Sequence, residues 1–257
     1  MKIAIIGAGK MGAWLAGELA KNNEVAVYDV DISRAKATSN TKILSDLSAL
    51  KEFKPELLIN AVSLQHTITV FEEVVKHLNK GCVISDIASI KGSIPEFYEK
   101  SGFEFVSTHP MFGPTHAKMN ALSGQNAIII KESDKVGADF FRAFFTGLGL
   151  RIFDYTFEEH DKMMAYSLST PFSASLVFAA CVDKTAVPGT NFAKHMALAK
   201  GVLGEDDHLI AEVLFNKYSL AALEKITNKL EFLKHVIKAR DYDEASRFFN
   251  KLRKNME

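Results

Sequence analysis

The first nineteen residues of the chain combine a short apolar strand, a glycine-rich turn and a helix. The run Gly7-Ala8-Gly9-Lys10-Met11-Gly12 follows apolar residues 3–6, and Met11, Leu15 and Leu19 share one side of the helix that it opens. The first glycine permits a tight turn, the second lets backbone amides approach a pyrophosphate, and the third brings helix and strand together. The helix N-terminus adds N–H donors and a positive dipole end. The pattern predicts a dinucleotide-binding loop, with a plain turn as the alternative; its residues are Gly7, Ala8, Gly9, Lys10, Met11 and Gly12.

A second strand, predicted over Glu24–Asp29, ends in a carboxylate 17 residues after Gly12. A carboxylate in this place can accept hydrogen bonds from both ribose hydroxyls of NAD and would repel the additional phosphate of NADP. Asp29 is therefore predicted to bind the cofactor, and Ser63, just after another predicted strand, is assigned with it. Arg34 is near enough to accept a 2′-phosphate, so NADP stays open as an alternative while NAD is favoured.

Short apolar runs alternate with helical stretches through the first 155 residues. Several runs are nearly continuous Val, Ile and Leu, as strands covered on both faces require. Amphipathic segments such as 69–78 and 134–145 separate them, and this alternation predicts an α/β fold, a Rossmann-type parallel sheet wrapped by helices. The strands are predicted at Lys2–Ile6, Glu24–Asp29, Leu57–Val62, Cys82–Asp86, Phe103–Thr108, Asn126–Ile130 and Arg151–Phe153.

After about Tyr155, helical periodicity replaces the strand signals. We therefore predict a dinucleotide-binding Rossmann domain over residues 1–155 and an all-helical C-terminal domain over residues 156–257. Apolar residues spaced by three and four form a narrow seam that either closes the subunit's own core or meets a second chain. The seam consists of Leu223, Ile226, Leu230, Leu233 and Ile237, and a shorter helix follows with Ala245, Phe248, Phe249 and Leu252.

The composition excludes several classes of protein. Lys plus Arg and Asp plus Glu both number 31, so the net charge is zero and a surface for nucleic acid or anionic membranes is not expected. Met1 leads directly into a strand without the features of a signal peptide, and the most apolar stretch, 172–182, is about half as long as a membrane span. Cys82 and Cys181 are far apart, which predicts two buried thiols and neither a disulfide nor a metal site. We expect a cytoplasmic protein.

Two loops with polar content follow predicted strand ends, where open parallel sheets bind their ligands. The first runs from Asp86 to Lys91 and includes Ser89, and the second is His109-Pro110-Met111-Phe112-Gly113-Pro114. Both loops are predicted to face the nicotinamide end of the dinucleotide.

His109 suits the removal of a hydroxyl proton during hydride transfer, because a neutral imidazole has a pKa of roughly 6.5. Ser89 could bond the same hydroxyl or the nicotinamide amide, and Lys91 could meet an anionic group of the substrate. The alternatives are a histidine that caps its loop, a local turn bond for Ser89 and a solvated lysine. Asp86 is expected to organise its own loop.

His160-Asp161 is predicted to open the first helix of the C-terminal half, which Pro171 would break or kink. His160 is either a substrate ligand or a polar residue at the helix start. A helix from this point would also bring Tyr166 near Ser169. The histidines without companion spacing are expected at the surface or between domains: His66, His77, His195, His208 and His235.

These motifs, in this order, resemble the prephenate dehydrogenases. The glycine loop, the Asp-x-x-Ser-x-Lys run at 86–91, the loop at 109–114 and Glu159-His160-Asp161 carry the resemblance up to about residue 180. The most similar type is the short one without a fused chorismate mutase.

The resemblance implies that His109 bonds the ring hydroxyl of prephenate, that Ser89 touches this hydroxyl and the nicotinamide, and that Lys91 helps to organise the pocket. It implies NAD as cofactor, 4-hydroxyphenylpyruvate and carbon dioxide as products, and a place in tyrosine biosynthesis. The helical domain is expected to bind substrate and to form a homodimer.

The chain departs from the family pattern at two points. A histidine that many members carry about twelve residues after the His-Asp pair is replaced by Phe172, and the usual arginines for the substrate carboxylates are not recognisable. Lys217, Lys225 and Arg247 are the nearest cations. Arogenate as substrate and feedback by tyrosine therefore stay open, as do another small-acid dehydrogenase and a non-enzymatic NAD sensor.

Overall fold

The computed structural model describes residues 1–112, 122–183, 185 and 187–257. Within these residues, packing divides the chain into two units, Met1–Met164 and Ala165–Glu257. The sequence placed a boundary near Tyr155, whereas the division comes after the helix α8 (Phe157–Met164), whose His160 is fully buried in the N-terminal unit. The predicted residues Gly113 and Pro114 lie outside the described residues.

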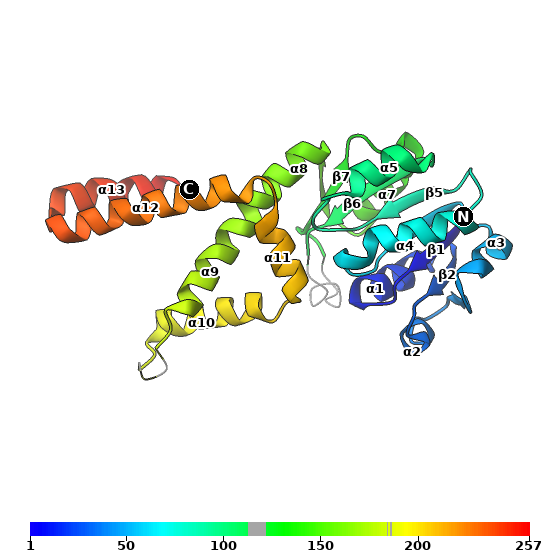
Figure 1. Ribbon diagram of the computed structural model, residues 1–257, viewed down its shortest axis with the longest axis horizontal. Coiled ribbons are helices and arrows are strands. Elements are labelled where there is room, and N and C mark those ends of the chain that lie inside the picture. The colour runs from blue at the N-terminus through cyan, green and yellow to red at the C-terminus, as the bar shows by residue number, and fades with distance from the viewer. Residues whose placement is uncertain (113–121, 184, 186) are drawn as a thin grey trace. The chain divides into compact units, whose positions relative to one another are not determined.

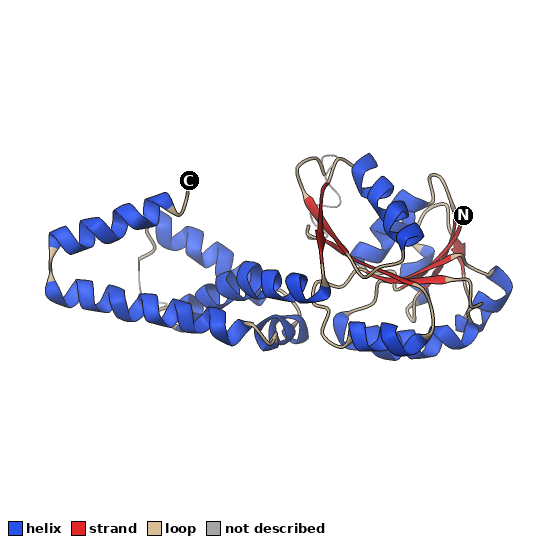
Figure 2. Ribbon diagram, turned by 90° about the horizontal axis from the view of Figure 1, so that it is seen from above, coloured by secondary structure: helices blue, strands red, loops and turns tan. Residues whose placement is uncertain are grey.

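The N-terminal unit is built on an eight-stranded sheet with the order β3-β2-β1-β4-β5-β6-β7-β8 (Figures 1 and 2). All paired strands are parallel, as predicted, except β6 and β7, whose antiparallel pairing the sequence did not indicate. The two-residue strand β3 was not predicted, because so short a segment has no readable alternation. The strands are β1 Lys2–Ile6, β2 Glu24–Tyr28, β3 Lys42–Ile43, β4 Leu57–Asn60, β5 Val83–Asp86, β6 Phe105–Pro110, β7 Asn126–Ile130 and β8 Arg151–Tyr155.

Helices cover both faces of this sheet, as Figure 2 shows. Because successive strand residues point to opposite faces, Ile3 and Ile5 of β1 pack in one core cluster, with residues of α1 and α7, while Ala4 and Ile6 pack in the other, with residues of α4 and α5. The α-helices are α1 Lys10–Leu19, α2 Ile32–Lys36, α3 Leu50–Phe53, α4 Thr67–Val74, α5 Ile94–Ser101, α7 Lys135–Gly147 and α8. Short 3₁₀ turns lie at η1 Leu47–Ala49, η2 Leu64–His66 and η3 Val75–His77.

The C-terminal unit is helical in its described residues, as predicted. Its elements are the π-helical turn η4 Ala165–Ser169 and the helices α9 Thr170–Ala180, α10 Thr190–Leu203, α11 Asp207–Phe215, α12 Ser219–Ala239 and α13 Tyr242–Lys254. The hydroxyls of Ser169 and Ser219 both donate to the carbonyl of Val213, at 2.8 and 3.0 Å, and so tie three of these elements together. The helices α12 and α13 lie side by side (Figures 1 and 2), with the rings of Phe232 and Phe248 5.0 Å apart.

Pro171 does not break its helix. Helical residues continue from α8 through the π-helical turn η4 into α9, and Pro171 occupies the first turn of α9. A proline inside a helix removes one backbone hydrogen bond and crowds the carbonyl four residues earlier, and a wider π-turn relieves that crowding. The expected disturbance therefore appears as a local change of helix type.

The two cysteines differ in environment. Cys82 is buried, and burial raises the pKa of its thiol to about 12, so it stays protonated. Cys181 is exposed, which corrects the expectation of two buried thiols. The reason is its place at the C-terminal end of α9, where the chain leaves the helix.

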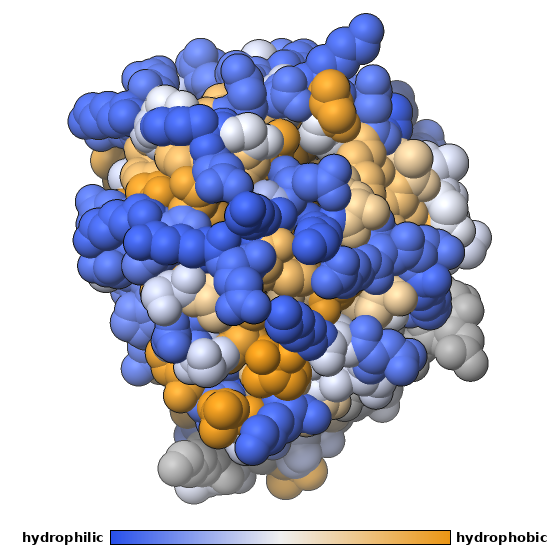
Figure 3. Space-filling model, turned by 90° about the vertical axis from the view of Figure 1, so that its right-hand side faces the viewer, coloured by the Kyte–Doolittle hydropathy of each residue, from blue (hydrophilic) through white to orange (hydrophobic). Residues whose placement is uncertain are grey.

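Exposed apolar side chains are unevenly distributed among the described residues. Six large ones lie in residues 1–164 and fifteen in residues 165–257. The side of the N-terminal unit seen in Figure 3 is mostly hydrophilic, with apolar side chains in small groups between polar ones. The helical unit therefore carries most of the apolar surface.

One helical run in the described residues, Phe157–Ala180, is long and apolar enough by composition to cross a membrane. Such a run is weak evidence for a span, because helices of other proteins pass the same test. Its first turns belong to the N-terminal unit, where His160 is hydrogen-bonded to the sheet residue His109. We therefore treat the run as part of the globular fold.

We predict that alanine substitutions at two glycines of α1 change the stability of the protein in opposite directions. A Cβ on Gly12 would collide with the carbonyl oxygen of Gly7, whereas a Cβ on Gly17 would meet nothing within 4 Å among the described atoms. We expect Gly12→Ala to lower the free energy of unfolding by about 1–3 kcal/mol, because the backbone must move. Gly17→Ala should raise it by roughly 0.5–1 kcal/mol, the usual gain of alanine over glycine in a helix.

Urea unfolding of both variants and the parent protein measures this difference. Equal stability of Gly12→Ala and Gly17→Ala would show that the loop does not hold α1 against β1 as described.

Candidate active site

The glycine loop has the geometry that a dinucleotide phosphate requires. Gly7 has a φ of 98°, and a Cβ there would lie 2.8 Å from the backbone of Ala61. Gly9 is the N-cap of α1, and no side chain forms a hydrogen bond to the N-terminus of this helix. The space beside Gly9 is open, because a Cβ there would meet no described atom within 4 Å. The first N–H groups of α1 have no partner within the helix by its geometry, and an anion can accept from them. The residues fit a bound pyrophosphate.

Asp29 lies beside this loop, at the end of β2. One carboxylate oxygen accepts the N–H of Ala8 at 2.6 Å, and the other accepts the N–H of Asp31 at 2.8 Å. Each carboxylate oxygen has a second lone-pair site, so hydroxyls of a ribose can still be accepted. The structure thus adds a role that the sequence did not reveal: Asp29 holds the glycine loop in place. Its contact with a ribose stays a prediction.

The remaining predicted cofactor residues surround the same strand ends. Lys10 and Met11 form the first turn of α1, with Lys10 exposed and Met11 packed against the core. Ser63 is exposed in the segment after β4, and its carbonyl accepts the N–H of His66 at 2.9 Å. Arg34, the residue that left NADP open, is paired with Asp31 at 3.3 Å.

A buried ion pair organises the loop after β5. Asp86 and Lys91 have no exposed side-chain surface, and the Nζ of Lys91 lies 2.6 Å from Oδ2 of Asp86. The same ammonium donates to the carbonyl of Thr108 in β6 at 2.8 Å, and the hydroxyl of Tyr98 in α5 donates to the other oxygen of Asp86 at 2.8 Å. The prediction that Asp86 organises its loop agrees with these contacts.

Lys91 was predicted to meet an anionic group of the substrate, or to be a solvated lysine. The structure buries it completely, so the solvated alternative is wrong. Burial lowers the pKa of Lys91, and the carboxylate of Asp86 opposes this shift. Its ammonium donates to Asp86 and to the carbonyl of Thr108, and substrate binding by Lys91 stays a prediction. Ser89 is half-buried in the same loop.

His109 does not lie beyond the end of its strand. It is the fifth residue of β6, which pairs with β5 through Ser107 and with the antiparallel β7 from Thr108 onward. The predicted strand ended at Thr108, one residue before His109; instead, the change of partner strand extends β6 to Pro110. The next residues follow the sheet: the N–H of Met111 bonds the carbonyl of Asn126 at 2.9 Å. Phe112 packs on Trp14.

The structure brings His109 and His160 together. Nδ1 of His109 lies 3.1 Å from Nε2 of His160, and both side chains are buried. Nδ1 of His160 lies 3.2 Å from Oδ1 of Asp161. His160 was predicted as a substrate ligand or a helix-start residue; it is the fourth residue of α8, and its described contacts are with His109 and Asp161.

Both imidazoles are held neutral. Burial, followed by the nearby His160 and the positive charge of Lys91, lowers the pKa of His109 well below its usual value. Burial also lowers the pKa of His160, although the hydrogen bond to Asp161 opposes the shift. A neutral, buried imidazole can accept a proton from a ligand hydroxyl at neutral pH.

Sequence reasoning missed Tyr98 as part of this network. The spacing in the sequence could have indicated it, because Tyr98 lies four residues after Ile94 and therefore on the same, buried side of α5. A buried tyrosine hydroxyl needs a hydrogen-bond partner, which here is Asp86. It also missed the contact between the two histidines, which are 51 residues apart in sequence.

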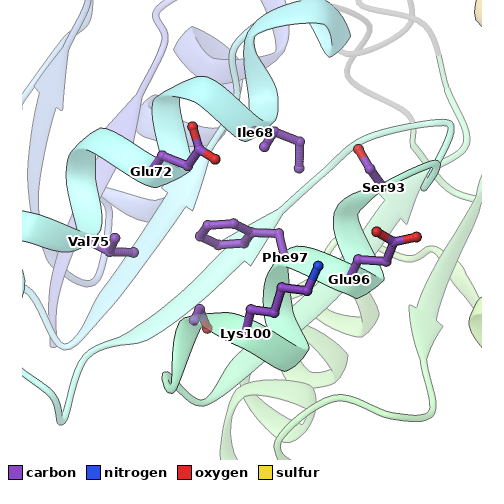
Figure 4. Close-up of a pocket in the computed structure, with 8 residues that line it drawn as sticks. Ile68, Glu72, Val75, Ser93, Glu96, Phe97 and Lys100 are labelled. Carbon is purple, nitrogen blue, oxygen red and sulfur yellow. The ribbon is translucent and has the colours of Figure 1, made fainter.

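A separate hollow lies between α4 and α5, with a volume of about 440 Å³. Figure 4 shows the ring of Phe97 between the two helices, with Glu96 and Lys100 beside it on α5. None of the residues that line it belongs to the predicted site, so we assign it no part in the chemistry. They are Ile68, Glu72, Val75, Ser93, Glu96, Phe97, Lys100 and Ser101.

Comparison with known proteins settles the family. Residues 15–152, more than half of the chain, match the family described as prephenate dehydrogenase, nucleotide-binding domain. The chain belongs to the prephenate dehydrogenase family. The resemblance seen in the sequence is confirmed at this level, and the matched residues begin just after the glycine loop at 7–12.

Curated relatives carry both substrate names of this family. The chain is 26% identical over 264 residues to the probable arogenate/prephenate dehydrogenase of Methanocaldococcus jannaschii, covering 94% of this chain and 58% of that protein. It is 24% identical over 250 residues to arogenate dehydrogenase 1, chloroplastic, of Arabidopsis thaliana, covering 91% of this chain and 39% of that protein. The chain thus spans about half the length of these relatives.

Solved structures share the fold over the whole chain. The prephenate dehydrogenase of A. aeolicus, crystallised with hydroxyphenyl propionate and NAD+, has a TM-score of 0.86 at 18% identity, covering 100% of this chain and 97% of that one. Synechocystis arogenate dehydrogenase has a TM-score of 0.81 at 20% identity, covering 100% and 99%. The predicted fold class, a Rossmann-type sheet followed by a helical part, is confirmed.

The neutral histidines predict a loss of stability in mild acid. The pKa of His109 and of His160 is lower in the folded protein than the roughly 6.5 of an unfolded chain. Above pH 6.5 both states are neutral; below it the unfolded chain gains protons that the folded protein does not bind. We expect the free energy of unfolding to fall between pH 7.5 and 5.5 by up to about 1.4 kcal/mol for each histidine.

Urea unfolding at the two pH values measures this loss. His109→Gln should reduce the pH dependence, whereas His66→Gln, which changes an exposed ring, should leave it intact. A parent protein equally stable at both pH values would contradict the neutral, buried pair.

Proposed function

We propose that the protein is an NAD-dependent prephenate dehydrogenase that converts prephenate to 4-hydroxyphenylpyruvate and carbon dioxide. The observation that carries this proposal is the buried His109 of β6, hydrogen-bonded to His160 and with its pKa lowered by burial, in the sheet whose strand β1 leads into the glycine loop. The reaction would serve tyrosine biosynthesis. A cytoplasmic location is proposed with it, as expected from the sequence.

NAD is the proposed cofactor. The A. aeolicus structure of this fold was crystallised with NAD+, and the open space over Gly9 and the carboxylate of Asp29 fit its pyrophosphate and ribose. The pairing of Arg34 with Asp31 favours NAD over NADP, because this guanidinium already has an anionic partner. Bound NAD+ would supply the acceptor for a hydride.

His109 is the proposed catalytic base. Its imidazole accepts the proton of the ring hydroxyl while hydride leaves the carbon that bears this hydroxyl. The bond to the ring carboxylate then breaks, carbon dioxide departs, and its electron pair makes the ring aromatic. The proton returns from His109 to the ring oxygen, so the base ends neutral. Ser89 is proposed to bond the same hydroxyl and the nicotinamide.

In this proposal, the buried residues Asp86 and Lys91 keep His109 neutral and in place. Lys91 places a positive charge near His109, which disfavours the imidazolium before substrate arrives. The contacts of Lys91 with Asp86 and Thr108 join the loop that carries Ser89 to the strand that carries His109. Lys91 therefore acts in this proposal through position and charge.

Arogenate is the second candidate substrate, because curated relatives bear that name. It has an amino group in place of the side-chain keto group of prephenate, and the reacting ring is the same. His109 and Ser89 can therefore serve either substrate. Lys217, Lys225 and Arg247 stay proposals for binding substrate groups away from the ring, whereas both ring nitrogens of the buried His160, the other residue predicted for this task, already face His109 and Asp161.

The proposal predicts NADH formation with prephenate and its loss when His109 is replaced. His109→Asn should lower kcat by about 10²–10⁴-fold, the usual effect of removing a general base. Binding of NAD+, measured by calorimetry, should be unchanged. Absorbance of NADH with prephenate or arogenate at equal concentrations measures the rates and ranks the two substrates.

His208→Asn, the same change on a half-buried histidine of α11 outside the site, is the matched control and should keep the parent rate. Turnover of arogenate alone would favour the second candidate. NAD+ binding without turnover of either substrate would favour a sensor, and an unimpaired His109→Asn variant would remove this residue from the mechanism.

A homodimer formed by the helical unit is also proposed. Leu223, Leu230 and Ile237 follow one another at intervals of seven on α12 and are 41%, 53% and 66% exposed. Ile226 and Leu233 of the predicted seam are partly buried, so the seam does not close the subunit's core completely. Exposed apolar residues at this spacing suit contact with a second helix.

Sedimentation equilibrium should give about twice the chain mass of 28.4 kDa. Leu230→Glu should shift the protein toward the monomer, because a carboxylate cannot be buried there without a partner. Asn228→Glu introduces the same group on the opposite side of α12 and should leave the dimer intact. A monomeric parent protein would exclude the proposal.

A further inference from the structure

Three acid–base side chains form a hydrogen-bonded row within the N-terminal unit. Nδ1 of His109 lies 3.1 Å from Nε2 of His160, and Nδ1 of His160 lies 3.2 Å from Oδ1 of Asp161. His109 belongs to β6, and the other two belong to α8. His160 has no exposed surface, so solvent cannot replace either partner.

The chemistry of the row fixes where its protons lie. An ionised carboxylate only accepts, so the nitrogen of His160 that faces Asp161 must carry a proton. A neutral imidazole has one N–H, which leaves Nε2 of His160 as an acceptor. Nδ1 of His109 must then donate to it, and the single proton of neutral His109 is used.

The opposite arrangement needs a charged His160. Only an imidazolium could donate to Asp161 and to His109 at once. The charged groups near the pair are Asp86 at the end of β5, Lys91 in the loop that follows it, and Asp161 on α8. Burial and the Lys91 ammonium disfavour a second positive charge here, and the carboxylates only partly offset them.

We propose that His160 and Asp161 are positioning residues that fix His109 as the tautomer protonated on Nδ1, with a free electron pair on Nε2. This inference rests on the proposed function, in which His109 accepts the proton of the ring hydroxyl. The proton binds Nε2, the Nδ1–H bond to His160 is kept throughout, and the proton leaves Nε2 again when the ring oxygen takes it back. The ring plane of the base is fixed by the same bond.

The tautomer can be observed without substrate. The whole protein is labelled with ¹⁵N-histidine, and two-bond ¹H–¹⁵N correlation spectra are recorded at neutral pH. The chain has eight histidines, and the signals of His109 are those missing from His109→Gln. We expect a protonated Nδ1 and an unprotonated Nε2 for His109, and the same pattern for His160. An Nε2-protonated His109, or a doubly protonated His160, would overturn the proposal.

Two substitutions test the consequence for turnover. His160→Leu removes the acceptor and should lower kcat by about 10²-fold with little change in the KM for substrate or NAD+, because only the base is misplaced. His160→Gln offers a carbonyl oxygen to the Nδ1–H of His109 and should restore most of kcat and the tautomer. His208→Leu makes the same change at a half-buried histidine of α11, outside the row, and should leave kcat unchanged.

The outcomes separate this inference from the proposed function. Turnover of prephenate or arogenate with the wrong tautomer would refute the row and leave the enzyme activity standing. The expected tautomer without turnover of either substrate would refute the function and, with it, the catalytic role of the row. A Leu variant with the parent kcat, or a Gln variant as slow as the Leu variant, would also count against it. If His160→Leu fails to fold, the spectra of the parent protein still decide.

Discussion

The buried ion pair between Asp86 and Lys91 is the interaction on which the site depends. Removing two charges from water is costly, and such a pair persists only when its geometry is good and its other donors and acceptors are satisfied. Here the carboxylate also accepts from Tyr98 and from the N–H of Ala88, and the ammonium also donates to Thr108. The pair thus joins β5, β6 and α5 at one place. Removing either partner would leave a buried charge, with a cost of several kcal/mol.

The same pair sets the electrostatics around His109. Lys91 lowers the pKa of both histidines, and the carboxylate of Asp86 opposes this at His160 with a smaller effect. Burial is the largest cause of both shifts and acts in the same direction as Lys91, so two effects keep His109 neutral. The Asp161 carboxylate acts against them at His160 and supplies the acceptor that orders the row. The neutrality and the orientation of His109 therefore come from different residues.

What could be predicted from the sequence was local. The glycine turn before α1 and the strands of the inner sheet were predicted close to their observed places because a few neighbouring residues specify them: the glycine at position 7, whose φ is 98°, and the continuous apolar runs of β1 and β4. The contact of His109 with His160 and the burial of Lys91 were missed because each depends on a partner from another element. The reversal between β6 and β7 and the exposure of Cys181 were missed for the same reason. Local patterns identified the candidate residues, and only the fold showed which of them are in contact.

The division of the chain into two units suggests how members of one family can act on two different substrates, prephenate and arogenate. On the proposed function, the base, its row and the cofactor loop all lie within Met1–Met164, and they act on a ring that prephenate and arogenate share. The two substrates differ in a side chain that these residues need not contact. The ring chemistry can therefore stay constant while the groups that meet the side chain vary. Changes at His109 or His160 should then affect turnover of both substrates alike, and discrimination between them must come from residues outside the row.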